Sequence, residues 1–396
     1  MTNDVAIHGY CSPEFEPVRT AFANNFVEFG ELGASCCVYL DGKPVVDIWG
    51  GWADIAKTKP WQEHTLSGFY SVGKSFTALC ALRAAEQHGV DLNAPVTDIW
   101  PEYGQNGKQH TTLRHLLTHR GGMPAIRKPL PDDALFDWSL MVDSLAEQAP
   151  YWQPGTEHGY HTNTMGLLVG ECVRRISGLP IDQYFQKHVA EPLGADTHFG
   201  LSDEDLKRAA EISWPAQEQI GEPAPASTQE TPDEQPTEVV EFMAMMESAY
   251  SNPNGISSLG VYNTDGWRQT VAPSANGFGT AKGIARIYNA LALGGTTDGY
   301  EVIKQSTLEE ARRIQCEGHD KILRREIRWG LGFQLTHPNR PMGPNPNSFG
   351  HFGNGGSLGF ADPDTNLAFG YTLNRIVRDW GSPQNKALMK AVYSCL

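Results

Sequence analysis

The sequence predicts an α+β fold in which both ends of the chain contribute strands to one antiparallel sheet and the middle of the chain is helical. β-rich runs occupy residues 34–49 and 329–373, whereas residues 71–193 show helical spacing and loops. Strands at both ends with helices between them indicate a sheet shared by the two termini and flanked by helices, with a helical insertion. Clefts favour the seam between two such lobes, so we expect the functional site there.

The N-terminal elements follow from apolar spacing and from one turn dipeptide. Residues 17–29 place apolar side chains at helical intervals, which predicts a helix. Two β-rich runs follow, Ala34–Leu40 and Lys43–Trp49, and Asp41-Gly42 joins them. Because an Asp-Gly pair between two such runs is a strong hairpin signal, we expect these two strands to pair with each other.

The middle of the chain is predicted to be mostly helical. An apolar stretch from Phe76 to Ala85 has helical character, and so do shorter stretches that begin at residues 116, 167 and 184. Residues 221–238 are rich in Pro, Glu, Gln, Thr and Ala, a composition that predicts a surface loop or a mobile flap.

Strand patterns return near the C-terminus, after an amphipathic helix predicted over residues 281–293. The predicted strands are Trp329–Leu335, Gly356–Ala361 and Leu367–Leu373, followed by a closing helix over residues 385–395. We accordingly expect a discontinuous sheet domain of residues 1–80 and 270–396, and a mostly helical domain of residues 81–269. The active site is expected between them.

Bulk composition excludes several classes of function. The 396 residues include 31 basic and 46 acidic residues, for a net charge of −15, which argues against nucleic acid and anionic membranes as partners. There is no run of 18 apolar residues and no secretory leader, so no membrane span is expected. Seven cysteines without a Cys-x-x-Cys pair fit a reducing cytoplasm. No metal-site or nucleotide-binding spacing occurs, so no metal or cofactor is expected.

The most informative motif is Ser71-Val72-Gly73-Lys74, the one Ser-x-x-Lys in the chain. A helix places residues three apart on the same face, so the Lys74 ammonium can reach the Ser71 hydroxyl. A serine becomes a nucleophile when an adjacent base takes its proton, and a lysine can be that base when burial or a nearby cation lowers its pKa. The alternative is a helix N-cap serine followed by a solvated lysine.

Three later segments carry a resemblance to a known family. They are LRHLLTHRGGMP at residues 113–124, WQPGTEHGYHTN at residues 152–163 and FGHFGNGGSLGFADP at residues 349–363. Together with the Ser-x-x-Lys motif, they make the chain resemble the serine β-lactamase and penicillin-binding-protein superfamily, in particular the family VIII carboxylesterases. The resemblance runs from about residue 15 to residue 375 and implies a β-lactamase/DD-peptidase-like fold.

The resemblance also implies roles for the residues of the first and third motifs. Ser71 takes the place of the acylated nucleophile, and Lys74 that of its partner base. The family's Tyr-x-Asn pattern is spaced Tyr-x-x-Asn here, so the expected tyrosine falls on Tyr160 or His161. We favour Tyr160, because the esterase branch that the chain resembles often shows a Pro-Gly-x-x-x-x-Tyr-His pattern, which residues 154–161 match. In that role, a phenol near two cations can ionise partly and shuttle a proton. The alternative is a buried aromatic side chain with a bonded hydroxyl. His161 and Asn163 are assigned to substrate binding.

The last segment occupies the place of the Lys-Thr-Gly strand of β-lactamases. Its triplet is His351-Phe352-Gly353, and the family pattern makes Asn354 a backbone N–H donor to the oxyanion, beside Ser71. His351 and Gly353 are assigned to substrate binding. A mostly neutral histidine in place of lysine removes a positive charge, so we expect poor β-lactam recognition and better handling of neutral esters. The alternative is a Gly-rich hairpin near a sheet edge.

Two further patterns are interpreted as structural. We expect His115 and His119 to hold the loop below the site rather than to act as general bases. Residues 355–359 fit the G-x-S-x-G elbow of α/β-hydrolases, but the strand–turn–helix context of that elbow is missing. Ser357 is therefore the less favoured nucleophile.

The resemblance implies a serine hydrolase that cleaves small-molecule carboxylic esters, most readily those with short acyl chains, through an acyl-enzyme on Ser71. From the cysteine usage we expect it to be cytoplasmic. Two alternatives use the same scaffold, namely β-lactam or amide hydrolysis and acyl transfer to a second alcohol or amine. A third is a non-catalytic binding protein, whose usual mark is loss of the motif's Ser or Lys; both are present here.

Overall fold

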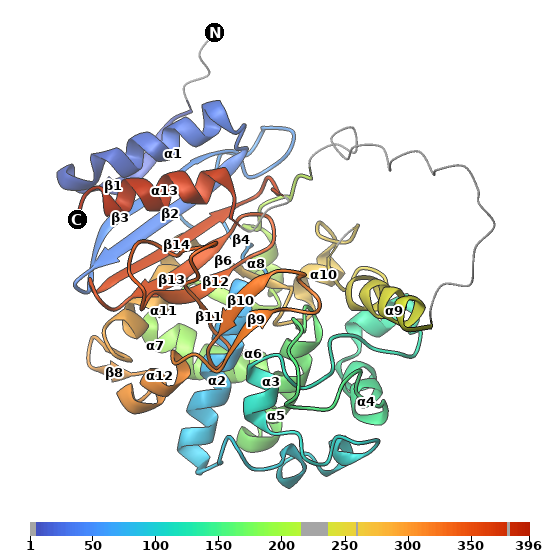
Figure 1. Cartoon of the computed structure of the whole chain (residues 1–396). Coiled ribbons are helices and arrows are strands. Elements are labelled where there is room, and N and C mark those ends of the chain that lie inside the picture. Colours follow the sequence, from blue (N-terminus) through green and yellow to red (C-terminus); the bar gives the residue numbers. More distant parts are fainter. Residues whose placement is uncertain (1–4, 215–236, 259, 378–380) are drawn as a thin grey trace.

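A nine-stranded antiparallel sheet forms one half of the molecule (Figure 1). The computed structural model describes residues 5–214, 237–258, 260–377 and 381–396. In spatial order the strands are β1 (Ile7–Cys11), β3 (Lys43–Gly51), β2 (Gly33–Leu40), β14 (Leu367–Leu373), β13 (Leu358–Asp362), β12 (Phe349–Phe352), β11 (Gln334–Leu335), β10 (Glu326–Trp329) and β9 (Cys316–His319).

The two ends of the chain meet inside this sheet. Strand β2 pairs with β14, so that Leu40 lies opposite Leu367 and Ala34 opposite Leu373. This pairing confirms the α+β fold and the sheet built from both termini. The Asp-Gly hairpin between β2 and β3 is also confirmed, and both turn residues have positive φ, 49° for Asp41 and 79° for Gly42. That conformation matches the right-handed twist of the flanking strands.

Helices cover both faces of the sheet. Helices α1 (Glu16–Glu28) and α13 (Pro383–Tyr393) pack on one face, and α11 (Ala281–Ala292) packs on the other (Figure 1). Alternate residues of β2 therefore enter different cores, Cys36 with α1 and α13, and Cys37 with α11. This explains why most of the β2 run is apolar rather than alternating between apolar and polar residues.

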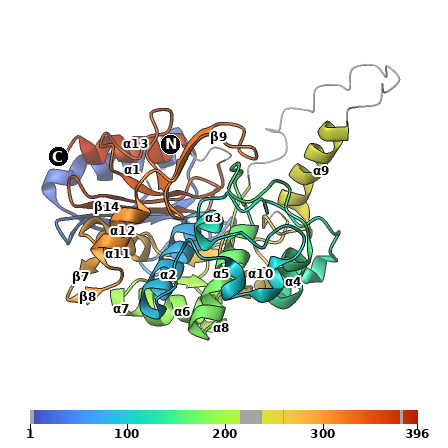
Figure 2. The ribbon, with the colours of Figure 1, turned by 60° about the horizontal axis from the view of Figure 1, so that its bottom comes forward.

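The other half of the molecule is mostly helical (Figures 1 and 2). Its helices are α2 (Val72–His88), α3 (Leu113–Leu117), α4 (Trp138–Glu147), α5 (Thr164–Ser177), α6 (Ile181–Phe185), α7 (Glu191–Leu193), α8 (Asp203–Leu206), α9 (Thr237–Ser251) and α10 (Asp265–Gln269), and α12 (Gln305–Ala311) lies nearer the sheet. A small sheet of β4 (Ser67–Gly68), β6 (Gly277–Gly279) and β5 (Thr197–Phe199), and a hairpin of β7 (Thr296–Thr297) and β8 (Tyr300–Glu301), complete the described elements.

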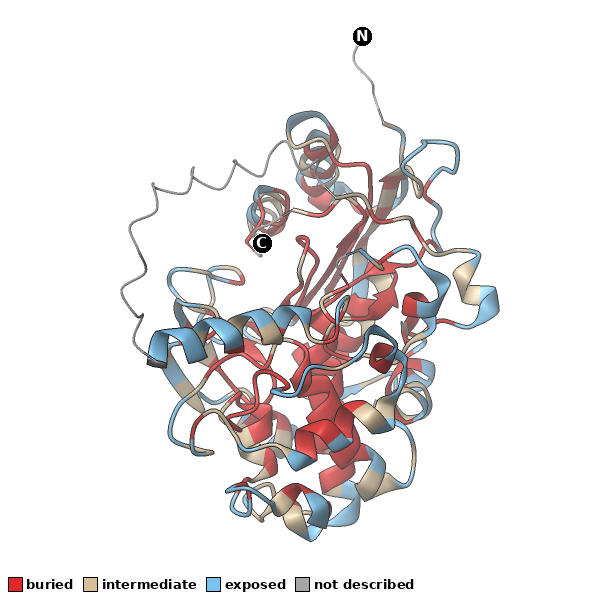
Figure 3. Cartoon of the chain, turned by 90° about the vertical axis from the view of Figure 1, so that its right-hand side faces the viewer, coloured by how far each residue is buried: buried red, intermediate tan, exposed pale blue. Residues whose placement is uncertain are grey.

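Helix α2 runs through the centre of the molecule (Figure 3). Most of its side chains are buried, because it packs against α5 on one side and approaches β12 of the large sheet on the other. A helix that is apolar nearly all round is stable only in such an interior position. It ends at Gly89, whose positive φ of 67° caps the last turn. The packing of α2 between α5 and β12 places its first turn at the junction of the two halves.

Two sequence predictions need correction or fall outside the structure. The strand predicted over Trp329–Leu335 is instead the end of β10, a tight turn, and the start of β11. Gly332 makes this turn with a φ of 76°, and a Cβ there would lie 2.1 Å from the Cβ of Ala78 in α2. Of the flap predicted over residues 221–238, residues 221–236 lie outside the described residues, and the last two belong to α9.

Within the described ranges, no helix combines the length and the apolar character that crossing a lipid bilayer requires. The proposed boundaries between a sheet domain of residues 1–80 and 270–396 and a helical domain of residues 81–269 stay a prediction.

Candidate active site

Ser71 and Lys74 lie at the first turn of α2, as the motif predicts. Ser71 is the N-cap residue and is 6% exposed, and Lys74 is completely buried. Because one helical turn separates the two residues, the Lys74 Nζ atom lies 3.1 Å from Ser71 Oγ. Lys74 Nζ also donates to the main-chain carbonyl of Ser274 at 2.9 Å. The alternative of a solvated lysine is therefore wrong.

Tyr160 reaches the same serine from a distant part of the chain. Its hydroxyl donates to Ser71 Oγ at 2.8 Å, and Lys74 Nζ lies 4.7 Å from the centre of its ring. The ring is fully buried and stacks on Trp329 of β10, with 5.5 Å between the ring centres and 3° between the planes. Ser71 Oγ thus has an amine and a phenol within hydrogen-bond distance.

Burial shifts the pKa values of these two groups toward their uncharged forms. It holds the pKa of the Lys74 ammonium well below its ordinary value of 10.5, and no carboxylate among the described residues forms an ion pair with Lys74. Burial also raises the pKa of the Tyr160 phenol well above 10, and the hydrogen bond with Ser71 offsets this in part. A neutral amine is a base and a protonated phenol is an acid. The direction of this shift runs against the expectation that Tyr160 ionises partly.

These groups open into a cavity of about 350 Å³ at the junction of the two halves. Its wall includes Ser71 and Tyr160, the two residues that precede α5, the end of α9 and the loop between β9 and β10. Its lining residues are Tyr70, Ser71, Tyr160, Thr162, Asn163, Tyr250, Ser257, Ser258, Ser274, Ala275, Ile322, Leu323, Arg325 and Asn354. The residue before the serine, Tyr70, has a positive φ of 48°, a backbone conformation that is costly for a non-glycine residue and that clusters at functional sites.

Asn163 lies in the site, whereas His161 does not line it. The Asn163 amide donates to the carbonyl of Ala249 and to Ser257 Oγ, at 2.8 and 3.0 Å. His161 is fully buried; its Nε2 accepts the Met123 N–H at 3.0 Å and its Nδ1 bonds the Gly159 carbonyl at 2.6 Å. Both ring nitrogens are thus engaged with backbone, so the assignment of His161 to substrate binding is corrected to a structural role.

The 351–354 segment contributes one residue to the cavity wall. Asn354 lines the cavity, and Gly353 lies where a Cβ would come within 2.5 Å of the Phe69 carbonyl oxygen. His351 lies behind Tyr160, with 6.0 Å between the ring centres, and is not among the lining residues. Its assignment to substrate contact is corrected accordingly. Burial lowers the pKa of His351 to about 3, so its ring is uncharged at neutral pH.

His115, His119 and Ser357 have structural roles. His115 Nδ1 accepts the Thr112 N–H in a helix capping box, and buried His119 accepts the His161 N–H at 3.1 Å. Ser357 is fully buried, donates to the Phe69 carbonyl at 3.1 Å and precedes an antiparallel strand. A nucleophile elbow leads instead into a helix from a parallel strand.

Several site residues carry no motif, and sequence reasoning missed them. Arg325 brings a guanidinium to the cavity wall from the β9–β10 loop. Asp320 opens that loop and is fully buried, and its Oδ1 accepts the Tyr160 N–H at 3.0 Å and two N–H groups of the loop itself. An Asp that follows a strand and caps its own turn is a signal for a loop, but nothing local points to its contact with Tyr160.

No group of three or more His, Cys, Asp or Glu side chains suited to hold a metal ion occurs in the part of the chain that the structure describes. The seven cysteines are all described, and all are thiols.

The Beta-lactamase family model matches residues 22–393, nearly the whole chain. The chain belongs to the β-lactamase family. Among curated relatives of this family member, the Mycobacterium tuberculosis protein "Esterase/beta-lactamase LipL" is 32% identical over 380 residues, which cover 94% of this chain and 83% of the relative.

Two solved structures of the family superpose over 99% of this chain and 100% of their own chains. One is described as a family VIII carboxylesterase, with 35% identity and a TM-score of 0.89. The other is a penicillin-binding protein homologue from Caulobacter crescentus, with 34% identity and a TM-score of 0.87. The predicted superfamily and the predicted fold are thereby confirmed.

Proposed function

We propose that the protein is a serine carboxylesterase that forms an acyl-enzyme on Ser71. The observation that carries the proposal is the position of Ser71 Oγ in the wall of a cavity, 3.1 Å from the Lys74 amine and 2.8 Å from the Tyr160 phenol. Burial lowers the pKa of Lys74 and raises that of Tyr160, which favours the uncharged form of each. The descriptions of two relatives, a family VIII carboxylesterase and LipL, support ester cleavage as the reaction.

In the proposed acylation step, Lys74 takes the Ser71 proton as Oγ attacks the acyl carbonyl carbon. A neutral lysine can do this because its lone pair is available, and burial lowers the pKa of Lys74, which favours the neutral form. Tyr160 then gives its proton to the departing alkoxide and recovers a proton from Lys74. The deacylation step repeats this exchange with water as the attacking group.

The negative charge that develops on the carbonyl oxygen needs hydrogen-bond donors fixed in place. We assign this task to the main-chain N–H groups of Ser71 and Asn354, since both residues line the same cavity. Asn163 is assigned to contact the substrate, because its amide is held rigidly at the cavity wall by α9 and by Ser257. Both assignments are part of the proposal.

Small-molecule esters without charge are the proposed substrates. The position that carries a lysine in β-lactamases holds His351, which is uncharged and buried behind Tyr160. Arg325, however, brings a cation to the cavity wall and favours β-lactam hydrolysis as a second activity, because a β-lactam carries a carboxylate. We further propose a cytoplasmic location, which the seven unpaired thiols support.

The test is hydrolysis of p-nitrophenyl acetate and butyrate by the wild type and by Ser71→Ala. We expect the variant to lose more than about 10³-fold in kcat/KM, because it lacks the hydroxyl that forms the proposed acyl-enzyme. Ser357→Ala is the matched control, since Ser357 is the competing serine, and it should lose far less. Equal activity of Ser71→Ala and wild type would overturn the proposal.

A chromogenic cephalosporin and an added alcohol acceptor separate the alternatives. Faster turnover of the cephalosporin than of the esters would make β-lactam hydrolysis the main activity, and transfer to the alcohol in preference to water would make the protein an acyltransferase. If a fluorophosphonate probe fails to label the folded wild type, the protein is a binding protein.

A further inference from the structure

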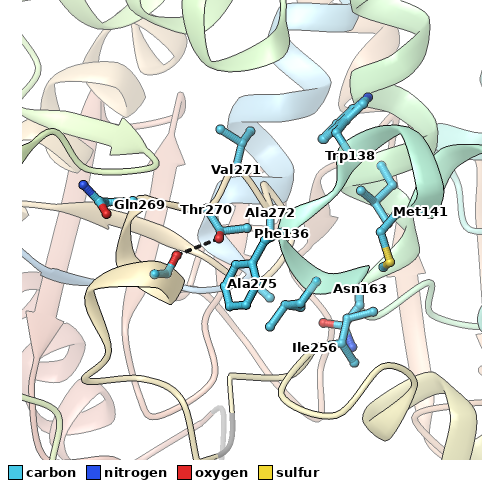
Figure 4. Close-up of a pocket in the computed structure, with 13 residues that line it drawn as sticks. Phe136, Trp138, Met141, Asn163, Ile256, Gln269, Thr270, Val271, Ala272 and Ala275 are labelled. Atoms are coloured by element: carbon cyan, nitrogen blue, oxygen red, sulfur yellow. Dashed lines mark hydrogen bonds between the residues drawn. The ribbon is translucent and has the colours of Figure 1, made fainter. Parts of the chain in front are cut away.

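A second cavity, of about 500 Å³, lies beside the Ser71 cavity in the helical half (Figure 4). Its size is within the range of about 300–1,000 Å³ that small-molecule sites have. Most of its wall is apolar, and its lining residues are Leu135, Phe136, Trp138, Met141, Asn163, Leu167, Ile256, Gly266, Gln269, Thr270, Val271, Ala272 and Ala275. Phe136 is 54% exposed and lies at its rim, so the cavity has an apolar entrance as well as an apolar interior.

The few polar groups of this wall are already bonded to protein atoms. Thr270 Oγ1 donates to the Gly266 carbonyl at 2.7 Å, a bond drawn in Figure 4, and Gln269 donates to Asp203 at 2.8 Å. The Trp138 Nε1–H donates to Glu171 at 3.0 Å. The cavity therefore offers apolar surface rather than hydrogen bonds, which suits a hydrocarbon group.

The two cavities are neighbours that share a border. Asn163 and Ala275 line both of them. Asn163 is held in place by its bonds to α9 and Ser257, and Ala275 follows Ser274, whose carbonyl accepts from Lys74. Asn163 and Ala275 thus form the wall that the two cavities share, and the apolar cavity lies directly beyond them as seen from the Ser71 cavity.

The proposed chemistry fixes which part of the substrate extends in that direction. The leaving alcohol must lie close to the Tyr160 hydroxyl. Tyr160 and the β9–β10 loop, which Asp320 connects to the Tyr160 main chain, line the Ser71 cavity but not the apolar cavity. The oxyanion must meet Asn354. The third substituent of the tetrahedral carbon, the acyl chain, is left to point toward Asn163 and Ala275.

We propose that the apolar cavity beyond Asn163 and Ala275 binds the acyl chain of the ester, so that acyl groups longer than butyryl are the preferred substrates. This inference rests on the proposed esterase function. It changes the expectation of a short-chain preference, because each methylene that enters an apolar site raises kcat/KM about fourfold, the equivalent of about 0.8 kcal/mol. Alcohol groups of increasing length, which lie on the Tyr160 side, gain nothing from this cavity.

The test varies the acyl chain, the alcohol and the cavity separately. We expect kcat/KM to rise from p-nitrophenyl acetate to the hexanoate and octanoate, and to stay level from ethyl to hexyl acetate. Gly266→Leu fills the cavity at a place with room for the new Cβ, since the nearest atoms are ring carbons of Phe136 at 3.5 and 3.7 Å. Leucine also suits the α10 helix better than glycine does.

Gly266→Leu should lower the octanoate-to-acetate ratio of kcat/KM at least about tenfold, which corresponds to two displaced methylenes. Asp265→Leu is the control, because it puts the same side chain on the same helix at a residue that does not line the cavity, and it should leave the ratio unchanged. An unchanged ratio in Gly266→Leu would overturn the proposal while the esterase function stands. So would a preference that follows the alcohol instead of the acyl chain.

A binding measurement keeps the proposal testable without turnover. The Ser71→Ala protein is titrated with 8-bromooctanoate, whose bromine quenches tryptophan fluorescence on contact, and Trp138 lines the cavity. We expect 8-bromooctanoate to quench the fluorescence of the Ser71→Ala protein. The quenching should disappear when this protein also carries Trp138→Phe or Gly266→Leu. If no ester is hydrolysed in a Ser71-dependent way, the esterase function fails. The quenching measurement then decides by itself whether the cavity binds the acyl chain. If 8-bromooctanoate does not quench the tryptophan fluorescence, the proposal is overturned.

Discussion

Two buried lysine–tyrosine pairs can be compared in the described structure. Lys74 Nζ lies 4.7 Å from the ring centre of Tyr160, and Lys108 Nζ lies 5.2 Å from that of Tyr103. All four residues have no exposed surface. Burial lowers the pKa of both lysines, to about 8 for Lys108 and well below 10.5 for Lys74, and it raises the pKa of both phenols.

The two pairs differ in the hydrogen-bond partners of the lysine. Lys108 donates to the main-chain carbonyls of Ala146 and Gln148, so its amine closes a helix end. Lys74 donates one hydrogen bond to a main-chain carbonyl, and its second hydrogen-bond partner is the Ser71 hydroxyl. That hydroxyl is also within hydrogen-bond distance of the Tyr160 phenol. A perturbed pKa is therefore a property of burial, and it indicates catalysis only where a nucleophile and a cavity adjoin it.

The largest expected effect comes from replacing each amine. Lys74→Met should lower kcat/KM for p-nitrophenyl butyrate by about 10³-fold, within the range of general-base catalysis, because Ser71 loses its proton acceptor. The free energy of unfolding in urea should not fall, since a buried amine without a carboxylate partner is removed. Lys108→Met is the control and should leave kcat/KM unchanged. Equal losses of activity in the two variants would mean that burial alone accounts for the properties of Lys74.

The phenols give the second contrast. Tyr160→Phe keeps the ring stacked on Trp329 but removes the hydroxyl that bonds Ser71, so we expect kcat/KM to fall about 10²-fold. Tyr103→Phe removes a buried hydroxyl with no neighbouring nucleophile and should leave kcat/KM unchanged. Esters with a poor leaving group should suffer more from Tyr160→Phe than p-nitrophenyl esters do, because an alkoxide needs the proton more. Full activity of Tyr160→Phe would remove Tyr160 from the mechanism.

The pH profile gives the smallest and most diagnostic effect. Since neutral Lys74 is the base, kcat/KM should be constant above its lowered pKa and fall about tenfold for each pH unit below it. The acid limb should therefore lie well below pH 10.5, the ordinary lysine value. Lys108→Met should not change the pH at which the acid limb of the kcat/KM profile begins. An acid limb near the ordinary lysine value would contradict a buried, neutral Lys74.

Local patterns predicted the parts of the fold and site that depend on neighbours in the sequence. The Asp41-Gly42 hairpin was predictable because the dipeptide itself selects the turn. The contact between Ser71 and Lys74 was predictable because three residues make nearly one helical turn. The strand predicted over Trp329–Leu335 failed because an apolar run does not reveal the turn at Gly332, which the close approach of α2 requires.

The sequence by itself determined the superfamily, the α+β order of elements and the Ser71–Lys74 pair, since each is encoded in a short-range pattern. The family pattern already favoured Tyr160 over His161 from the sequence. Tertiary structure brought the Tyr160 hydroxyl to Ser71, 89 residues away in the chain, and left both ring nitrogens of His161 bonded to the backbone. It also lowered the pKa of Lys74, brought Asp320 to Tyr160 and set the apolar cavity beside the nucleophile. Desolvation and contact across distant segments exist only once the chain has folded.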